Sequence, residues 1–168
     1  MLLLLLISEN MKKLLLLLIF VMSINSVLAQ KYTKTYIQDA TKVASNWLDN
    51  IHNNKYEEAY GLLSKEVKAI YLEENWVTFM RQLMLEFGEI RNREMIKSYF
   101  QSEIEGHEDG FYVFIDYNVN YKNTQEHTET LVLKQNDKTK WEIAVFEFKY
   151  DDKNHKESPD NNKEIIEK

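Results

Sequence analysis

The sequence predicts an α+β domain in which N-terminal helices pack on a curved antiparallel sheet of about four strands. Two patterns indicate this class. In the first half of the chain, apolar residues recur every three or four positions, as they do on one face of a helix. In the second half, apolar and polar residues alternate, as they do in strands that bury one face. A sheet with one apolar face needs a second layer, and the helices supply it.

The first helix of the domain is predicted from an apolar stripe that begins at Tyr36 and ends at Ile51. Thr35 is a suitable N-cap, and residues 52–54 form a polar stop. Short helices are expected over residues 56–63 and after Ser64, which can cap the turn that runs to residue 71.

The best-marked helix follows over residues 72–87, because Leu72, Trp76, Met80 and Phe87 fall on one face. Gly88 stands where a left-handed residue ends a helix.

Four strands are predicted in the second half of the chain: 93–100, 111–121, 129–134 and 141–149. The second is the clearest, because its odd positions are apolar or aromatic throughout. In the last, the apolar phase switches between Val145 and Phe146, which indicates either a bulge or burial on both faces.

The N-terminus has the features of a signal peptide over residues 1–29. Lys12 and Lys13 form its basic region, residues 14–22 form its apolar region, and small side chains precede a cleavage point after Ala29. Met11 suits a true start better than Met1, and a retained N-terminal anchor is the alternative. We therefore expect export to the periplasm or the medium, a domain over 30–150, and a disordered polar tail over 151–168.

Composition excludes several classes of function. The chain has no cysteine, so disulfides, thiol nucleophiles and cysteine-bound metals are excluded. Its formal net charge of −6 and its interspersed lysines argue against a nucleic-acid partner. The four histidines have no ligand spacing, so neither a metal site nor a cofactor is expected; they are His52, His107, His127 and His155.

An ordered set of residues resembles domain-of-unknown-function family 4019, a group of exported bacterial proteins with a nuclear-transport-factor-two-like, cone-shaped architecture. The matching pieces include Ala44 with Trp47-Leu48, Trp76, Arg81, Phe87-Gly88 with Arg93, Asp109-Gly110 with Tyr112, Glu129-Thr130 and Trp141. The resemblance covers roughly residues 40 to 148. It implies the fold and export, but neither an activity nor agreed functional residues.

Arg81 and Arg93 are candidates for binding a carboxylate or phosphate ligand at the mouth of the cone, because a guanidinium can donate two parallel hydrogen bonds to such a group. The alternative is that these arginines, with Arg91, pair with nearby acids and stabilise the turn at Gly88; those acids are Glu86, Glu89 and Glu94.

Large aromatic residues are candidates for lining a ligand cavity, and the alternative is that they fill the core; they are Trp47, Tyr60, Trp76, Tyr117 and Trp141. Asp116 is a candidate catalytic base by analogy with the isomerases and dehydratases of the superfamily. It stands, however, among the even-numbered polar positions of its strand, which predicts that its side chain lies on the solvent side of the sheet.

Three hypotheses about function follow. The first is a non-catalytic domain that binds a small ligand or an envelope protein on the concave face of the sheet. The second is an isomerase- or dehydratase-like enzyme, which requires a buried carboxylate in the cavity. The third is a structural homodimer joined through the outer face of the sheet, which requires an apolar patch there.

Overall fold

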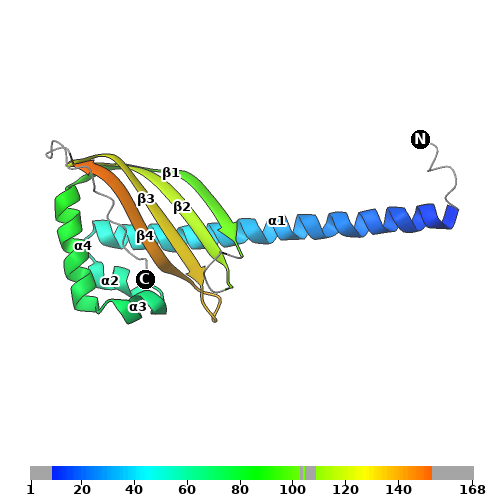
Figure 1. Ribbon diagram of the computed structural model, residues 1–168, viewed down its shortest axis with the longest axis horizontal. Coiled ribbons are helices and arrows are strands. Elements are labelled where there is room, and N and C mark those ends of the chain that lie inside the picture. The colour runs from blue at the N-terminus through cyan, green and yellow to red at the C-terminus, as the bar shows by residue number, and fades with distance from the viewer. Residues whose placement is uncertain (1–8, 103, 105–108, 153–168) are drawn as a thin grey trace. The chain divides into compact units, whose positions relative to one another are not determined.

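The computed structural model describes residues 9–102, 104 and 109–152 (Figure 1). The helices are α1 (Glu9–His52), α2 (Tyr56–Gly61), α3 (Lys65–Ile70) and α4 (Glu73–Phe87). The strands are β1 (Ile90–Gln101), β2 (Tyr112–Tyr121), β3 (Thr124–Gln135) and β4 (Trp141–Asp152). The predicted α+β class, with helices followed by a four-stranded antiparallel sheet, is confirmed.

Helix α1 corrects the predicted start of the first helix. It runs without a break from Glu9, so Thr35 lies inside it and is no N-cap. The physical reason is that residues 9–52 contain neither glycine nor proline, so nothing in the backbone ends the helix earlier.

The chain divides into two compact units, Met1–Thr35 and Tyr36–Lys168. In the first, residues 1–8 of the predicted signal peptide lie outside the described residues, as do the side chains of residues 9–11 and 14–31. Among the helices that the structure describes, none is both long and apolar enough to cross a membrane.

The cap that begins α3 and the glycine that ends α4 lie where the sequence predicts, whereas α2 ends at Gly61, before the predicted residue 63. Ser64 precedes α3, and its hydroxyl oxygen accepts a hydrogen bond from the backbone N–H of Val67 at 3.3 Å. Gly88 ends α4 with φ of 77°, and its N–H donates to the carbonyl of Met84 at 2.9 Å. The positive φ favours glycine here, and a Cβ atom at this position would lie 2.8 Å from the side chain of Asn123, which would have to shift.

The sheet has the order β1-β2-β3-β4, with every pair antiparallel. β1, β3 and β4 are longer than predicted, whereas β2 begins one residue later than predicted. β4 in particular continues to Asp152, past the predicted start of the tail, and the remaining tail residues, 153–168, lie outside the described part of the chain. β1 and β4 form the two edges, as the curved strands in Figure 1 show.

Irregular pairings mark the places where the sheet bends. β1 has register shifts beside Arg91 and Ile96, and β3 has one between Gln125 and Thr128. In β4 the extra residue is Ala144, because Ile143 pairs with Leu133 while Val145 pairs with Val132. The predicted bulge is therefore present, but it lies before Val145 rather than after it.

The bulge in β4 keeps the core continuous. Ile143 lies on the inner face before it, and Phe146 and Phe148 lie on the same face after it, where Phe146 contacts the ring of Trp47 at 5.0 Å. Val145 therefore lies on the opposite, outer face.

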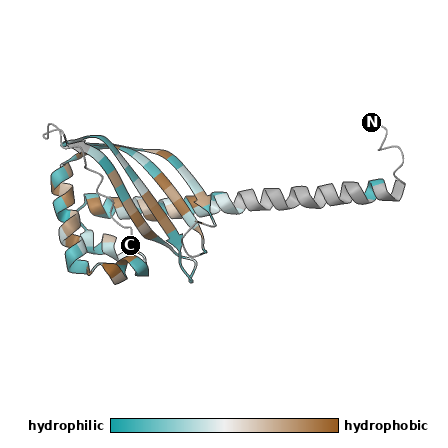
Figure 2. Cartoon of the chain, in the orientation of Figure 1, coloured by the Kyte–Doolittle hydropathy of each residue, from teal (hydrophilic) through white to brown (hydrophobic). Residues whose placement is uncertain are grey.

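The inner face of the sheet and the helices share one hydrophobic core. Val113, Ile115 and the later odd positions of β2 are buried, which confirms the phase predicted for this strand. Bands of hydrophobic and hydrophilic residues alternate along the strands in Figure 2. Trp141 is buried at the start of β4, and Tyr117 is buried on β2.

The outer face carries an apolar row that crosses all the strands. Tyr99 pairs with Phe114, Phe114 with Val132, and Val132 with Val145. The rings of Tyr99 and Phe114 stack at 4.8 Å with an interplanar angle of 4°. We call these residues the outer row: Tyr99, Phe114, Val132 and Val145.

Candidate functional site

A cavity of about 440 Å³ lies between β4 and the helices. Its helical wall includes Trp47 of α1 and Trp76, Phe79 and Met80 of α4, and its sheet wall is residues 143–146. Its volume falls in the range of about 300–1,000 Å³ that is typical of small-molecule pockets. It is well above the roughly 150 Å³ of a cavity that binds benzene.

The helical stripes explain why the tryptophans meet. Trp47 belongs to the buried face of α1 and Trp76 to that of α4, so packing both helices on the sheet brings their rings to 6.3 Å. Tyr60 of α2 packs against Trp76 at 5.7 Å from outside the cavity, and its hydroxyl donates to the carbonyl of Tyr71 at 2.8 Å. The structure thus brings together the predicted residues Trp47, Tyr60 and Trp76.

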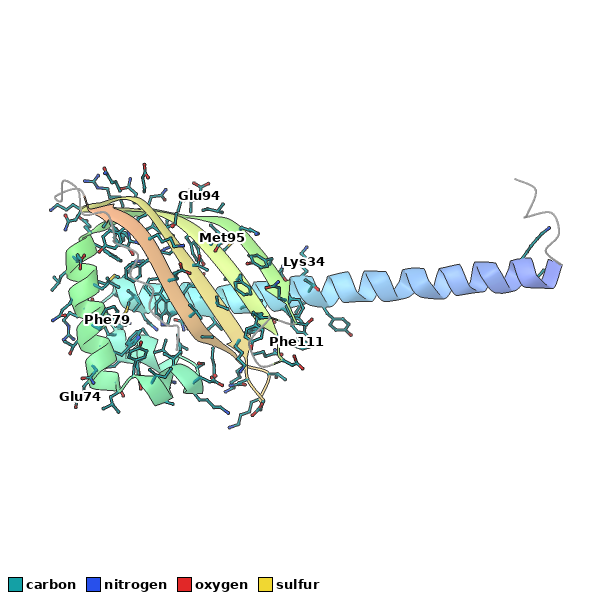
Figure 3. All side chains as sticks on the ribbon, viewed as in Figure 1. Lys34, Glu74, Phe79, Glu94, Met95 and Phe111 are labelled. Atoms are coloured by element: carbon teal, nitrogen blue, oxygen red, sulfur yellow. The ribbon has the colours of Figure 1, made fainter. Side chains whose placement is uncertain are left out.

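The lining of the cavity is apolar apart from Tyr71 and Asn75. On α4, Phe79 lines it, whereas Glu74, which is labelled on the same helix in Figure 3, does not. The carboxylates of the described chain lie elsewhere, so apolar contact rather than charge dominates this site.

Trp47 contributes an unusual polar group. Its side chain is fully buried, and within the described part of the chain its indole N–H has no hydrogen-bond partner. Buried polar groups are nearly always paired, because an unpaired one loses the hydrogen bond that water would provide. The indole of this cavity-lining residue therefore retains an unused donor.

A second cluster lies at the other end of the inner face, around a buried ion pair between Arg93 and Glu129. The Arg93 Nε and Nη2 atoms donate to Glu129 Oε2 at 3.0 and 2.7 Å, and the Glu129 side chain has no exposed surface. Tyr121 Oη accepts from Arg93 at 3.0 Å and donates to Glu129 Oε1 at 2.9 Å. Arg93 also lies over the ring of Tyr117 at 5.8 Å.

Two histidines border this ion pair. His52, at the end of α1, lies 3.1 Å from Arg93 Nη1 through its Nε2 atom. His127 Nε2 lies 3.5 Å from Glu129 Oε1, and its Nδ1 atom is 3.0 Å from the hydroxyl of Thr124. The ion pair thus connects β1, β2 and β3 with the end of α1.

Burial decides the protonation of these groups. Burial, together with the positive charge of Arg93, lowers the pKa of both His52 and His127 from 6.5 to about 4, so both rings are neutral at pH 7. Burial raises the pKa of Glu129, while Arg93 and the hydrogen bond from Tyr121 act in the opposite direction. Burial also raises the pKa of Tyr117 to about 12.

The remaining predicted residues lie away from the cavity. Arg81 is exposed on α4 and lies over the ring of Tyr56 at 5.5 Å, while Arg93 is held by Glu129, so the two arginines have different partners. Neither lines the cavity. The partner of Arg93 is also not one of the nearby acids that the alternative hypothesis named.

Asp116 lies on the outer face, as its phase predicts, and accepts a hydrogen bond from Thr130 at 2.7 Å.

Glu129 and His127 were not predicted from the sequence as buried polar residues. The available signal was their odd phase, shared with Leu131 and Leu133, which places them on the inner face of β3.

Among the described residues, no three histidines or acids are grouped so that they could hold a metal ion. The fold and the site define an α+β domain with an open four-stranded sheet and an apolar cavity at its β4 edge.

The family model described as "Protein of unknown function (DUF4019)" matches residues 43–146, so the chain belongs to this family. The resemblance noted from the sequence is confirmed. No curated protein and no solved structure matches the chain.

The ion pair yields a stability prediction. Replacing Arg93 with methionine leaves Glu129 buried without its cation, and we expect a loss of about 3–5 kcal/mol in the free energy of unfolding, measured in urea. Adding Glu129→Leu to that variant restores part of the loss, because the uncompensated charge is gone. The control is Arg91→Met at an exposed neighbouring position, which we expect to change stability by less than about 0.5 kcal/mol. Equal stability of the Arg93 and Arg91 variants would contradict this role.

The histidines yield a pH prediction. Because folding lowers the pKa of His52 and His127, the folded protein binds fewer protons than the unfolded chain between pH 6.5 and about 4. Their contribution to stability is complete above pH 6.5 and is lost as the pH falls toward 4. Protonation of Glu129 opposes this loss, because burial raises its pKa.

We expect the melting temperature to fall by several degrees across this window and the fall to be smaller in His52→Gln. Asn53→Gln, at an exposed and non-titrating neighbour, serves as the control and keeps the wild-type slope. A slope unchanged in His52→Gln would count against the assignment.

Proposed function

We propose that this protein is an exported, non-catalytic binding module whose cavity takes an apolar group of a ligand or partner. The observation that carries the proposal is the apolar cavity of about 440 Å³ with Trp47 and Trp76 in its wall. Aromatic and aliphatic linings with few polar groups are typical of ligand sites.

Export rests on the sequence of residues 1–29: two lysines, an apolar region, and a cleavage point after Ala29. The proposal that the protein binds without catalysing a reaction rests on the residues that line the cavity. An isomerase- or dehydratase-like site needs a carboxylate that reaches the substrate. Glu129 is buried in its ion pair with Arg93, and Asp116 lies on the outer face; neither lines the cavity.

The binding prediction uses the environment-sensitive dye 1-anilinonaphthalene-8-sulfonate as the probe and the full chain as the protein. We expect saturable binding, seen as dye fluorescence and as a change in tryptophan emission. Ala144→Leu places a larger side chain at the sheet wall of the cavity, and we expect it to weaken binding at least about tenfold.

The matched control is Ala69→Leu, the same substitution at an exposed alanine of α3 that does not line the cavity. We expect it to bind the dye as the wild type does. Equal weakening by both substitutions, or dye binding that neither changes, would overturn the proposed site.

A second function is favoured by the outer row. A continuous apolar row on a sheet face is a surface that a second copy of the chain can cover symmetrically. We expect light scattering to give twice the mass of one chain, and Phe114→Glu to give the mass of a monomer. Thr128→Glu, at an exposed position of the same face, is the control and keeps the dimer. A monomeric wild type would rule this function out.

A further inference from the structure

We propose that the cavity binds an extended peptide of a partner protein, which adds as a strand to the free edge of β4 and places an apolar side chain in the cavity. This inference rests on the proposed function and names the class of its ligand.

The position of the cavity is the first argument. Val145 lies on the outer face of the sheet and Phe146 on the inner face, yet both line the cavity. Successive side chains of a strand point to opposite faces, so a space that touches both residues lies at the edge of the strand. β4 is an edge strand, and the cavity therefore lies where a further strand would pair with it.

A segment of the chain already pairs with the β4 edge next to the cavity, at Ile143. The N–H of Ile143 donates to the carbonyl of Leu62 at 2.9 Å, and its carbonyl accepts from the N–H of Ser64 at 2.8 Å. Leu63 and Ile143 form a parallel bridge. The segment 62–64 is thus a short piece of strand on the β4 edge.

That piece of strand ends at the cavity. Ser64 caps α3, so the chain leaves the edge of β4 there and turns into the helix. Leu63 and Val67, on either side of this turn, both line the cavity. The cavity therefore occupies the place where segment 62–64 would continue if it remained extended.

The backbone beyond Ile143 is oriented for pairing. Within one strand, residues whose side chains share a face also point their N–H and C=O groups to the same edge. Ile143 and Phe146 share the inner face, so the backbone groups of Phe146 point to the same free edge as those of Ile143. Among the described residues, Ile143 is the β4 residue whose backbone bonds to a segment outside the sheet.

The chemistry of the partner follows from these two features. Backbone hydrogen bonds to Phe146 supply affinity without regard to sequence, and the cavity selects an apolar side chain that contacts Trp47, Trp76 and Phe79. Neighbouring side chains of the added strand point away from the cavity and remain polar. The fitting partner is an extended segment of alternating apolar and polar residues.

The test uses acetylated and amidated hexapeptides in which lysine alternates with valine, leucine or phenylalanine, and the full chain as the protein. The control peptides have the same composition with the apolar residues grouped together, because the protein is acidic and attracts lysine in any order. We expect at least one alternating peptide to bind at least tenfold more tightly than its grouped control, and Ala144→Leu to remove this difference. No preference in any of the three would overturn the inference.

Backbone pairing is tested by methylating peptide nitrogens. Alternate backbone N–H groups of a strand point to opposite edges, so only one of the two sets of residues in the peptide donates to β4. We compare one analogue with methylated backbone nitrogens at the apolar residues and another with methylated backbone nitrogens at the lysines. We expect one analogue to keep the affinity of the parent peptide and the other to bind at least tenfold more weakly. If both analogues bind like the parent, or neither binds, the added strand is excluded.

Amide hydrogen exchange gives a second readout. The amide of Phe146 should exchange faster than that of Glu147 in the free protein, because Glu147 lies on the outer face and its N–H points to β3. The peptide should slow the exchange of Phe146 at least tenfold. An amide of Phe146 that is already protected in the free protein, or unchanged by the peptide, would overturn the inference.

The two proposals fail in different ways. If the dye binds and Ala144→Leu weakens it while no peptide binds, the cavity takes a small molecule and only the peptide is excluded. If neither dye nor peptide binds, the proposed function fails as well.

Discussion

The buried ion pair between Arg93 and Glu129 is the interaction on which the arrangement of this domain depends. A fully buried carboxylate is unfavourable unless it is paired, so β1 and β3 must keep the register that brings the guanidinium to it. Tyr121 of β2 bonds to both groups, and His52 at the end of α1 lies against Arg93. One charge pair thus fixes the relative positions of three strands and the helix that covers them. Both histidines are neutral at pH 7, because burial and, after it, the charge of the Arg93 guanidinium lower their pKa values.

The other end of the inner face follows a different principle. No charged side chain of the described residues lines the cavity, and its shape results from where the backbone departs from regular structure. Ala144 is the extra residue of β4, and Ser64 ends the short pairing with Ile143 by starting a helix. Together they leave a length of the β4 edge beside Trp47 and Trp76 that no other described residue pairs with. Edge strands are normally protected because they pair readily with other chains. The proposed peptide site uses this edge, because an added strand can pair with it through backbone hydrogen bonds.

The two ends also suit different roles. The polar end is closed, with its carboxylate buried and its hydrogen bonds largely satisfied within the chain, so it stabilises the fold. The apolar end has space and an unused indole donor. The proposed binding site lies away from the ion pair, so a ligand bound there would leave the register of the sheet undisturbed. This separation also explains why Arg81 and Arg93 do not serve the cavity: one lies over Tyr56 and the other is committed to Glu129.

The sequence by itself determined the class of the fold, the order of its elements, the caps at Ser64 and Gly88, and the buried phase of β2. These features depend on local periodicity and on the backbone preferences of single residues, so a short stretch of sequence is enough to predict them. It also determined that Trp47, Tyr60 and Trp76 face inward. Only the tertiary structure decided that the bulge of β4 falls at Ala144 and that Arg93 pairs with Glu129. Those outcomes depend on which residues, distant in sequence, meet across the sheet. The register of the strands is set by many weak contacts, so it cannot be predicted from any short stretch of sequence.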